Sequence, residues 1–331
     1  MKAKIIGAAL VLAAISTAQV SAKPKSKSDS KASKPVIVAS MYPQYDFARA
    51  VAGDRADITM LLKPGAESHS YEPTPKDMKK IQKADLFIYT GGENDEWVET
   101  MLESFGSKTP KTLELLNLVD AVEEVIVEGM TAEEEEDHDH DHEADGHHHH
   151  HDEDEVELDE HVWTSPLNAI KITQAICDEL CGIDSANASY YKSNAAAYIS
   201  KLELLHSQFE SIVKNAKRKV FVFGDRFPLR YFADTYGLSY YAAFPGCATD
   251  VEASASTIKF LIDKVKEENI PVVFTIEFSN GKIADTICEV TGARKMEFHS
   301  CHNIKADDLK KGETYVSLMT RNISALKAAL N

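Results

Sequence analysis

The chain has 331 residues, and its 53 acidic side chains against 36 Lys and Arg give a formal net charge of −17 at pH 7. This acidity, with no basic stripe to neutralise phosphates, excludes nucleic acid as a partner. The length is sufficient for two domains of ordinary size.

Residues 1–22 have the pattern of a cleavable export signal. Two lysines precede the apolar run Ile5–Ile15, and small residues up to Ala22 form a typical cleavage site. The apolar run is too short to cross a bilayer, and no cysteine lies near the cleavage point. We therefore expect a soluble periplasmic protein that is cleaved near Ala22 and has no lipoprotein cysteine. The Lys/Ser-rich residues 23–34 are expected to be a flexible leader.

Residues 35–185 alternate short apolar runs with amphipathic segments. This is the pattern of a doubly wound α/β lobe with a parallel sheet. Thr74 followed by Pro75 predicts the start of one helix. Strands are predicted at 36–41, 57–62, 85–90 and 112–117, and helices at 45–51, 74–84, 94–105 and 167–180, the last ending at Gly182.

An acidic, histidine-rich tract interrupts this lobe in a loop, residues 129–158, that is predicted to be disordered. Between Glu133 and Glu155 the chain has thirteen acidic residues and eight of its thirteen histidines, without Lys or Arg. Such a tract buries no core, and its like charges repel. A solvated acidic linker is one interpretation. Interleaved imidazoles and carboxylates also bind divalent metals such as zinc, so we favour auxiliary metal binding by His138, His140, His142, His147, His148, His149, His150 and His151.

Residues 186–217 are predicted to form one long helix that links two halves of the chain. Asn187–Lys217 contains neither Pro nor Gly, its apolar side chains recur at three- and four-residue steps, and such a helix is about 45 Å long. The alternation of strands and helices then restarts, so residues 218–331 are predicted to form a second α/β lobe. Its strands are predicted at 219–223, 238–244, 271–276 and 295–299, and its helices at 228–236, 254–269, 281–291 and 315–330.

Polar residues collect where the predicted strands end, and ligands of open α/β sheets gather at these carboxyl ends. The candidates at these ends are His69, Asp225, Glu277, His299 and His302. His161 follows the acidic tract and joins them. Four of the five histidines outside the tract belong to this set, a coincidence that favours a metal site over hydrogen-bonded loop residues. The fifth, His206, lies in the long helix and is interpreted as a packing or surface residue.

The neighbours of His161 allow two interpretations. Asp159 and Glu160 either orient its second ring nitrogen, as metal-bound histidines usually require, or form the tail of the acidic tract. Trp97 and Trp163 are interpreted as core or hinge packing.

Several segments around these residues match a known family. They are GAESHSYEP at 65–73, DEHVWTSPLNA at 159–169, and RYFADTYGL and ETYVSLMTRNISALKAAL in the second half. They resemble the ZnuA/TroA-like solute-binding proteins of zinc and manganese ABC importers, and the resemblance covers nearly all of the chain after the leader. It implies two α/β lobes bridged by a rigid helix, one metal held between them, and an ABC permease in the inner membrane as the partner. It also implies that His69 and His161 are the ligands from the first lobe.

The second lobe departs from the family pattern. The family's third ligand falls at Gly224, which has no ligating side chain, and the fourth falls at His299. The ligands that the resemblance implies are therefore His69, His161 and His299. The candidates to complete the site are Asp225, Glu277, His302 or a water. Three imidazoles favour Zn²⁺ whereas carboxylate-rich sites suit Mn²⁺, so a zinc receptor is the leading interpretation and a manganese receptor its alternative.

We expect a monomeric binding protein and not an enzyme. A secreted zinc hydrolase with Glu277 as general base is the alternative from another class, but the sequence has no HExxH motif. A metal buffer or adhesin that meets no transporter is a third hypothesis.

The five cysteines permit disulfides in an exported protein. They are Cys177, Cys181, Cys247, Cys288 and Cys301. Cys247 with Cys301 is the preferred pair, which the sequence alone does not fix.

Overall fold

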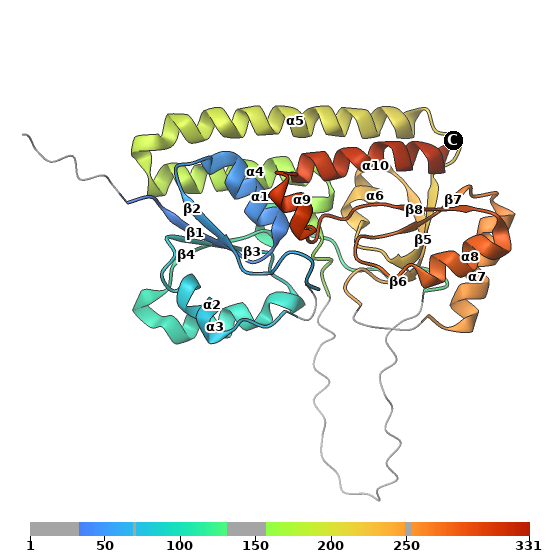
Figure 1. The fold of residues 1–331 in the computed structure, drawn as a ribbon, viewed down its shortest axis with the longest axis horizontal. Coiled ribbons are helices and arrows are strands. Elements are labelled where there is room, and N and C mark those ends of the chain that lie inside the picture. Colours follow the sequence, from blue (N-terminus) through green and yellow to red (C-terminus); the bar gives the residue numbers. More distant parts are fainter. Residues whose placement is uncertain (1–32, 69–70, 131–156, 249–252) are drawn as a thin grey trace, which may run out of the picture. The chain divides into compact units, whose positions relative to one another are not determined.

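The first half of the chain folds around a four-stranded parallel sheet with the strand order β2-β1-β3-β4 (Figure 1). The computed structural model describes residues 33–68, 71–130, 157–248 and 253–331. The strands are short apolar runs, and Ile37 of β1 pairs with Ile58 of β2 and Leu86 of β3. The elements are β1 (Val36–Ala39), α1 (Tyr42–Ala52), β2 (Asp57–Met60), α2 (Pro75–Ile81), β3 (Leu86–Tyr89), α3 (Glu96–Phe105) and β4 (Lys111–Glu114).

The second half repeats this arrangement with a parallel sheet of strand order β6-β5-β7-β8. Its elements are β5 (Val220–Arg226), α6 (Arg230–Tyr236), β6 (Ser239–Phe244), α7 (Ala255–Glu267), β7 (Val272–Thr275), α8 (Lys282–Thr291) and β8 (Arg294–Glu297). In both sheets the strand order reverses beside the first strand, between β1 and β3 and between β5 and β7. Ligands of open α/β sheets bind outside the carboxyl ends at such points.

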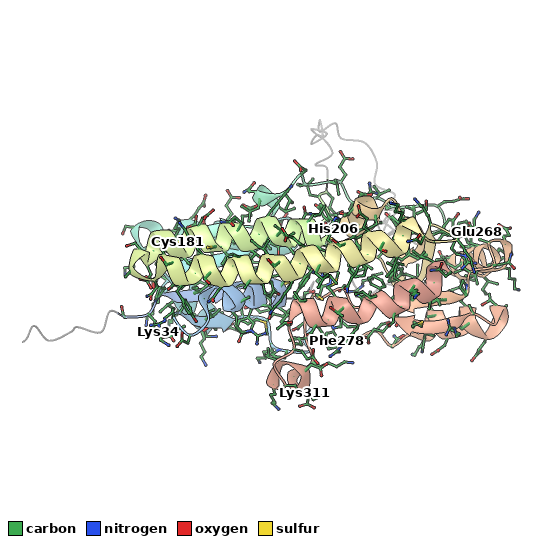
Figure 2. The ribbon with its side chains drawn as sticks, turned by 90° about the horizontal axis from the view of Figure 1, so that it is seen from above. Lys34, Cys181, His206, Glu268, Phe278 and Lys311 are labelled. Carbon is green, nitrogen blue, oxygen red and sulfur yellow. The ribbon has the colours of Figure 1, made fainter. Side chains whose placement is uncertain are left out.

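A layer of helices joins the two halves. The long helix α5 (Ala188–Lys214) packs against α4 (Pro166–Ile183) and α1 of the first half, and against α6 and α10 (Tyr315–Leu330) of the second. Figure 2 looks onto α5 and places His206 on it. The His206 ring stacks on Tyr236, with the ring centres 5.6 Å apart, which favours packing over the surface alternative. One continuous core runs beneath these helices, including Trp163, Phe209 and Phe274.

Local signals account for most element boundaries. Thr74 and Asp77 form a capping box at α2, as the sequence predicts. The prediction that Gly182 ends α4 is wrong, because the helix continues to Ile183. Asn94 does not cap α3 either: Asp95 occupies the N-cap position. Short elements that the sequence did not predict are α9 (Ala306–Lys310) and the 3₁₀ turns η1 (Glu93–Asp95), η2 (Gly106–Lys108), η3 (Leu116–Leu118), η4 (Val162–Thr164) and η5 (Ser185–Asn187).

The predicted fold class, two parallel α/β sheets with one long helix, is confirmed. Among the described residues, no helix has the length and apolarity needed to cross a membrane. The boundaries of the predicted domains stay a prediction. The predicted signal segment and almost all of the leader lie outside the described residues.

Candidate metal centre

His161 lies directly before η4, in the segment that returns from the acidic tract. Its side chain is fully buried. Its Nδ1 is 3.0 Å from Asp159 Oδ1, and its backbone N–H donates to the same oxygen at 2.9 Å. Asp159 therefore fixes the ring through Nδ1, as carboxylates do for metal-bound histidines, and Nε2 is the nitrogen through which a metal would bind.

Burial and neighbouring charges act in opposite directions on the pKa of His161. Burial lowers the pKa, but the charge and hydrogen bond of Asp159 and the charges of Glu160 and Glu124 raise it, and the result is above the usual 6.5. The carboxylate of Glu160 accepts two hydrogen bonds from Asn94, each 2.8 Å long. Burial raises the pKa of Glu160 to about 7. The prediction that an acidic neighbour orients His161 is thus confirmed for Asp159.

His302 comes from the loop after β8, in the other half of the chain, and its ring meets that of His161. The ring centres are 4.4 Å apart, and the ring planes cross at 88°. The indole of Trp163 lies against both rings, with its centre 5.7 Å from His161 and 5.0 Å from His302. Its Nε1 donates to Ser300 O at 2.9 Å. Trp163, predicted to be packing, therefore joins the two halves beside the two imidazoles.

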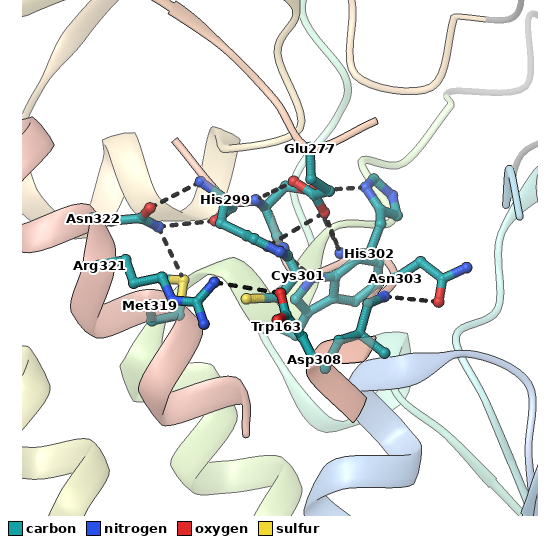
Figure 3. A network of polar contacts seen from close by, with 12 residues as sticks. Trp163, Glu277, His299, Cys301, His302, Asn303, Asp308, Met319, Arg321 and Asn322 are labelled. Atoms are coloured by element: carbon teal, nitrogen blue, oxygen red, sulfur yellow. Dashed lines mark hydrogen bonds and ion pairs between the residues drawn. The ribbon is translucent and has the colours of Figure 1, made fainter. Parts of the chain in front are cut away.

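The loop that carries His302 is held by Glu277, which follows β7 (Figure 3). The Glu277 carboxylate accepts hydrogen bonds from Ser300 N–H at 2.7 Å, from Ser300 Oγ at 2.8 Å and from His302 N–H at 3.0 Å. Between these residues Cys301 has a φ of +64°, which few residues other than glycine adopt. Glu277 is 4% exposed, so a buried carboxylate fixes the turn and places negative charge next to His302.

His299 contacts Glu277, residues of its own turn and α10, and its Nδ1 lies 3.5 Å from Glu277 Oε1. Its Nδ1 accepts a hydrogen bond from Cys301 N–H at 3.0 Å. Its backbone N–H and C=O pair with the side-chain amide of Asn322, each at 2.8 Å. The ring contact described above joins His302 to His161.

Asp225 is directed toward the loop after β7. Strand β5 continues to Arg226, beyond the predicted end at residue 223, so Asp225 belongs to the strand. Its carboxylate accepts hydrogen bonds from Arg226 N–H at 3.0 Å and from Ile276 N–H at 3.3 Å, and burial raises its pKa. Asp225 and Glu277 both line a cleft of about 200 Å³. The bond from Ile276 N–H ties the end of β5 to the segment that follows β7.

His69 and the eight histidines of the tract, from His138 to His151, lie outside the described residues. Ser68 and Tyr71 line a cavity together with Trp163 and His302. The cavity has a volume of about 20 Å³, which is room for one water molecule or ion.

The family model of ZnuA, described as zinc-uptake complex component A, periplasmic, matches residues 37–329. The chain belongs to this family. The predicted family is therefore confirmed.

Relatives and solved structures agree with this assignment. The high-affinity zinc uptake system protein ZnuA of Bacillus subtilis is 32% identical over 306 residues, which cover 92% of this chain and 91% of that protein. The zinc-binding lipoprotein AdcA of Streptococcus pneumoniae is 33% identical over 291 residues, which are 88% of this chain and 55% of AdcA. The chain thus spans about half the length of AdcA. The Zn(II)-bound ZnuA-like domain of that AdcA has a TM-score of 0.71 at 31% identity, with 90% of this chain and 99% of the domain covered. The metal-dependent lipoprotein YcdH of Bacillus subtilis has a TM-score of 0.72 at 29% identity, with coverages of 90% and 99%.

The family description bears on location as well. It places ZnuA proteins in the periplasm, in keeping with the predicted export. AdcA and YcdH are named lipoproteins, which conflicts with the expectation that this ZnuA-type chain has no lipoprotein cysteine. The absence of a lipoprotein anchor therefore stays a prediction.

In this ZnuA-type chain, no side chain fits at the position where the family pattern has its third ligand. A Cβ on Gly224 would lie 2.6 Å from Ala284 Cα and 2.7 Å from Ala284 N. These are backbone atoms of α8, which packs directly on β5. The close approach of helix and strand requires glycine here.

The preferred Cys247–Cys301 disulfide is wrong, because all five cysteines are free thiols. The two side chains have different surroundings. Burial raises the pKa of Cys301, and the charges of Glu277 and Asp46 raise it further. Cys247 instead lies beside Glu124, to which its backbone N–H donates at 2.9 Å.

A second group of metal-ligand atoms consists of Glu124, Glu157 and Cys247, whose donor atoms lie within 4.8 Å of one another. Glu124 N–H donates to Glu157 O at 2.9 Å, beside an antiparallel bridge between Glu123 and Leu158. Burial and the charge of Glu124 raise the pKa of Glu157 to about 7. Sequence reasoning missed this group because Cys247 comes from the second half of the chain. The only sequence signal for this group was the presence of acidic residues on both sides of the tract.

Proposed function

We propose that this chain captures one Zn²⁺ between its two halves and delivers it to the permease of an ABC importer. The ligands we propose are His161 and His302, joined by His69. His299 or Glu277 is the alternative for a fourth position.

The observation that carries this proposal is the meeting of two buried imidazoles from opposite halves. Their ring centres are 4.4 Å apart, Asp159 orients one ring, and Glu277 fixes the backbone of the other. Imidazoles held in this way are preferred ligands of zinc. The relatives named for zinc uptake and zinc binding support zinc over manganese as the metal.

Zinc is the cargo in this proposal, and the chain is not an enzyme. The cavity beside His302 has a volume of about 20 Å³, which is room for one ion. Because the ligands come from both halves, separating the halves at the permease would remove part of the coordination and release the ion. The protein would act in the periplasm as a monomer.

Zinc titration of single-histidine variants tests the proposal. Loss of a residue that only orients a ligand costs 10- to 100-fold in metal affinity, so loss of a ligand should cost at least about 100-fold. We expect this loss for His161→Ala and for His302→Ala, and less than about a twofold change for His206→Ala, which alters a histidine of the helical layer. Wild-type affinity in both ligand variants would refute the site. Displacement of bound zinc by equimolar Mn²⁺ would favour the manganese alternative.

A further inference from the structure

The ring of His302 is held by a side chain of its own turn. Its Nδ1 lies 3.1 Å from Ser300 Oγ. The same hydroxyl donates a hydrogen bond to Glu277 Oε1 at 2.8 Å, and all three residues are buried. A carboxylate, a hydroxyl and an imidazole thus form a continuous chain of hydrogen bonds in the turn after β8, where Glu277 lies beside His302 (Figure 3).

The direction of these bonds follows from the hydrogens that are available. A serine hydroxyl has one hydrogen to donate, and a carboxylate only accepts. Ser300 gives its hydrogen to Glu277, so it acts as the acceptor in its contact with the ring. Nδ1 of His302 therefore carries the ring proton, and the lone pair is on Nε2. Because the hydrogen bond of one ring nitrogen decides which nitrogen is left for a metal, His302 is prepared to bind through Nε2.

The first half of the chain holds its imidazole by the same principle. Nδ1 of His161 lies 3.0 Å from Asp159 Oδ1, and a carboxylate in this position fixes the tautomer of a ligating histidine and raises its basicity. In the second half a hydroxyl stands between the carboxylate and the ring. Ser300 therefore occupies the position, relative to His302, that the carboxylate of Asp159 occupies relative to His161.

The hydroxyl of Ser300 is separate from the bonds that shape the turn. Ser300 N–H donates to Glu277 Oε2 at 2.7 Å, and Ser300 O accepts from Trp163 Nε1 at 2.9 Å. His302 N–H donates to Glu277 Oε1 at 3.0 Å. In each of these bonds the turn contributes a backbone group, so Ser300→Ala leaves the three bonds in place and removes the hydroxyl alone.

We propose that Ser300 is a positioning residue for zinc: its hydroxyl connects the carboxylate of Glu277 to Nδ1 of His302 and fixes the ring in the tautomer that binds through Nε2. This inference rests on the proposed function, in which His302 is a ligand. Ser300 itself does not touch the metal. Without the hydroxyl, Nδ1 loses this acceptor, and in a fraction of the molecules the ring proton moves to Nε2 and blocks the lone pair.

Zinc titration of serine variants measures the effect. We expect Ser300→Ala to weaken zinc binding about tenfold, at the lower end of the 10- to 100-fold losses seen when a residue that orients a metal ligand is removed. Ser165→Ala is the matched control, because Ser165 is also buried and its hydroxyl lies 2.8 Å from Thr235 Oγ1. Each variant loses one buried hydroxyl bond and should lower the Tm of the zinc-free protein by a similar amount, but Ser165→Ala should change zinc affinity less than about twofold.

The tautomer itself is a readout that general destabilisation does not move. Nitrogen NMR of the zinc-free, histidine-labelled protein at about pH 8, where an ordinary imidazole is neutral, shows which ring nitrogen carries the proton. The signals of His302 are assigned by their absence from the spectrum of His302→Ala. We expect the proton on Nδ1 in the wild type and divided between the two nitrogens in Ser300→Ala. A wild-type His302 with its proton on Nε2 would overturn the proposal, and this result requires no serine variant to fold.

A double-mutant cycle with His302 completes the test. In the His302→Ala background, Ser300→Ala should change zinc affinity less than about twofold, because the ring that the hydroxyl holds is gone. A loss of equal size in both backgrounds, or one as large in Ser165→Ala, overturns the positioning role. Wild-type affinity in His302→Ala refutes the ligand named in the proposed function and the positioning with it. Unchanged affinity in Ser300→Ala beside a large loss in His302→Ala refutes the positioning role alone.

Discussion

Substitution of Gly224 by alanine should destabilise the protein without weakening zinc binding. The added Cβ would lie 2.6, 2.7 and 2.9 Å from Cα, N and Cβ of Ala284. All three distances are shorter than real Cβ contacts, and two of the three atoms belong to the backbone of α8. Overpacking in a filled interior costs about 1–3 kcal/mol, and we expect the upper part of this range because a helix backbone does not yield as a side chain does. For a chain of this size, about 2–3 kcal/mol lowers Tm by roughly 3–5 °C.

Thermal unfolding of the zinc-free protein, followed by circular dichroism, measures this effect. Gly182→Ala is the matched control: Gly182 lies within α4, and a Cβ there meets nothing within 4 Å. Alanine is favoured over glycine inside a helix by about 1 kcal/mol, so the same chemical change should raise Tm at residue 182 and lower it at residue 224. An unchanged or higher Tm for Gly224→Ala would contradict the explanation of why this position has no ligand.

The remaining predictions concern the pH dependence and the second group of donors. Zinc binds the deprotonated imidazole, and the pKa of His161 is raised above 6.5, so zinc affinity should fall with acidification from a pH above 6.5. Asp159→Asn removes a charge that raises this pKa, so the zinc affinity of the variant should begin to fall at a lower pH. Its affinity at pH 8 should drop about tenfold, because the ring loses its carboxylate partner. An unshifted pH profile in calorimetric titrations would count against the orientation by Asp159. Removal of residues 133–155 should leave one tight site and abolish only weaker zinc binding, as seen by equilibrium dialysis, and loss of the tight site would place it in the tract instead. Cys247→Ser should likewise leave the tight site unchanged in a chelator competition, whereas a large loss would assign zinc to the group with Glu124 and Glu157.

Local sequence patterns predict most of the fold. Apolar runs such as 271–276 and the Thr74 cap indicate elements that the structure contains, because their signals lie within a few residues. The misplaced end of α4 shows the limit of such signals. Gly182 is a common helix terminator, but the chain stays helical through it, and Asp184 accepts hydrogen bonds from Asn187 and Tyr191 just beyond the helix. These contacts between successive elements decide where the helix ends.

The candidate site is predictable in its residue types but less so in its geometry. The sequence identifies His161, His299 and His302 as candidates, and family resemblance favours His299. The structure turns the ring of His302 toward His161 through a loop in which Cys301 has a positive φ and Glu277 binds two backbone N–H groups. The residues 299–303, HSCHN, contain no local sequence signal for that conformation.

Anomalous diffraction at the zinc absorption edge, from crystals of the zinc-loaded protein, tests the central claim most directly. We predict one strong peak within about 2.0–2.1 Å of a ring nitrogen of both His161 and His302. A peak bound only by Glu124, Glu157 and Cys247, or one that His299 ligates while His302 does not, would contradict the proposed metal centre.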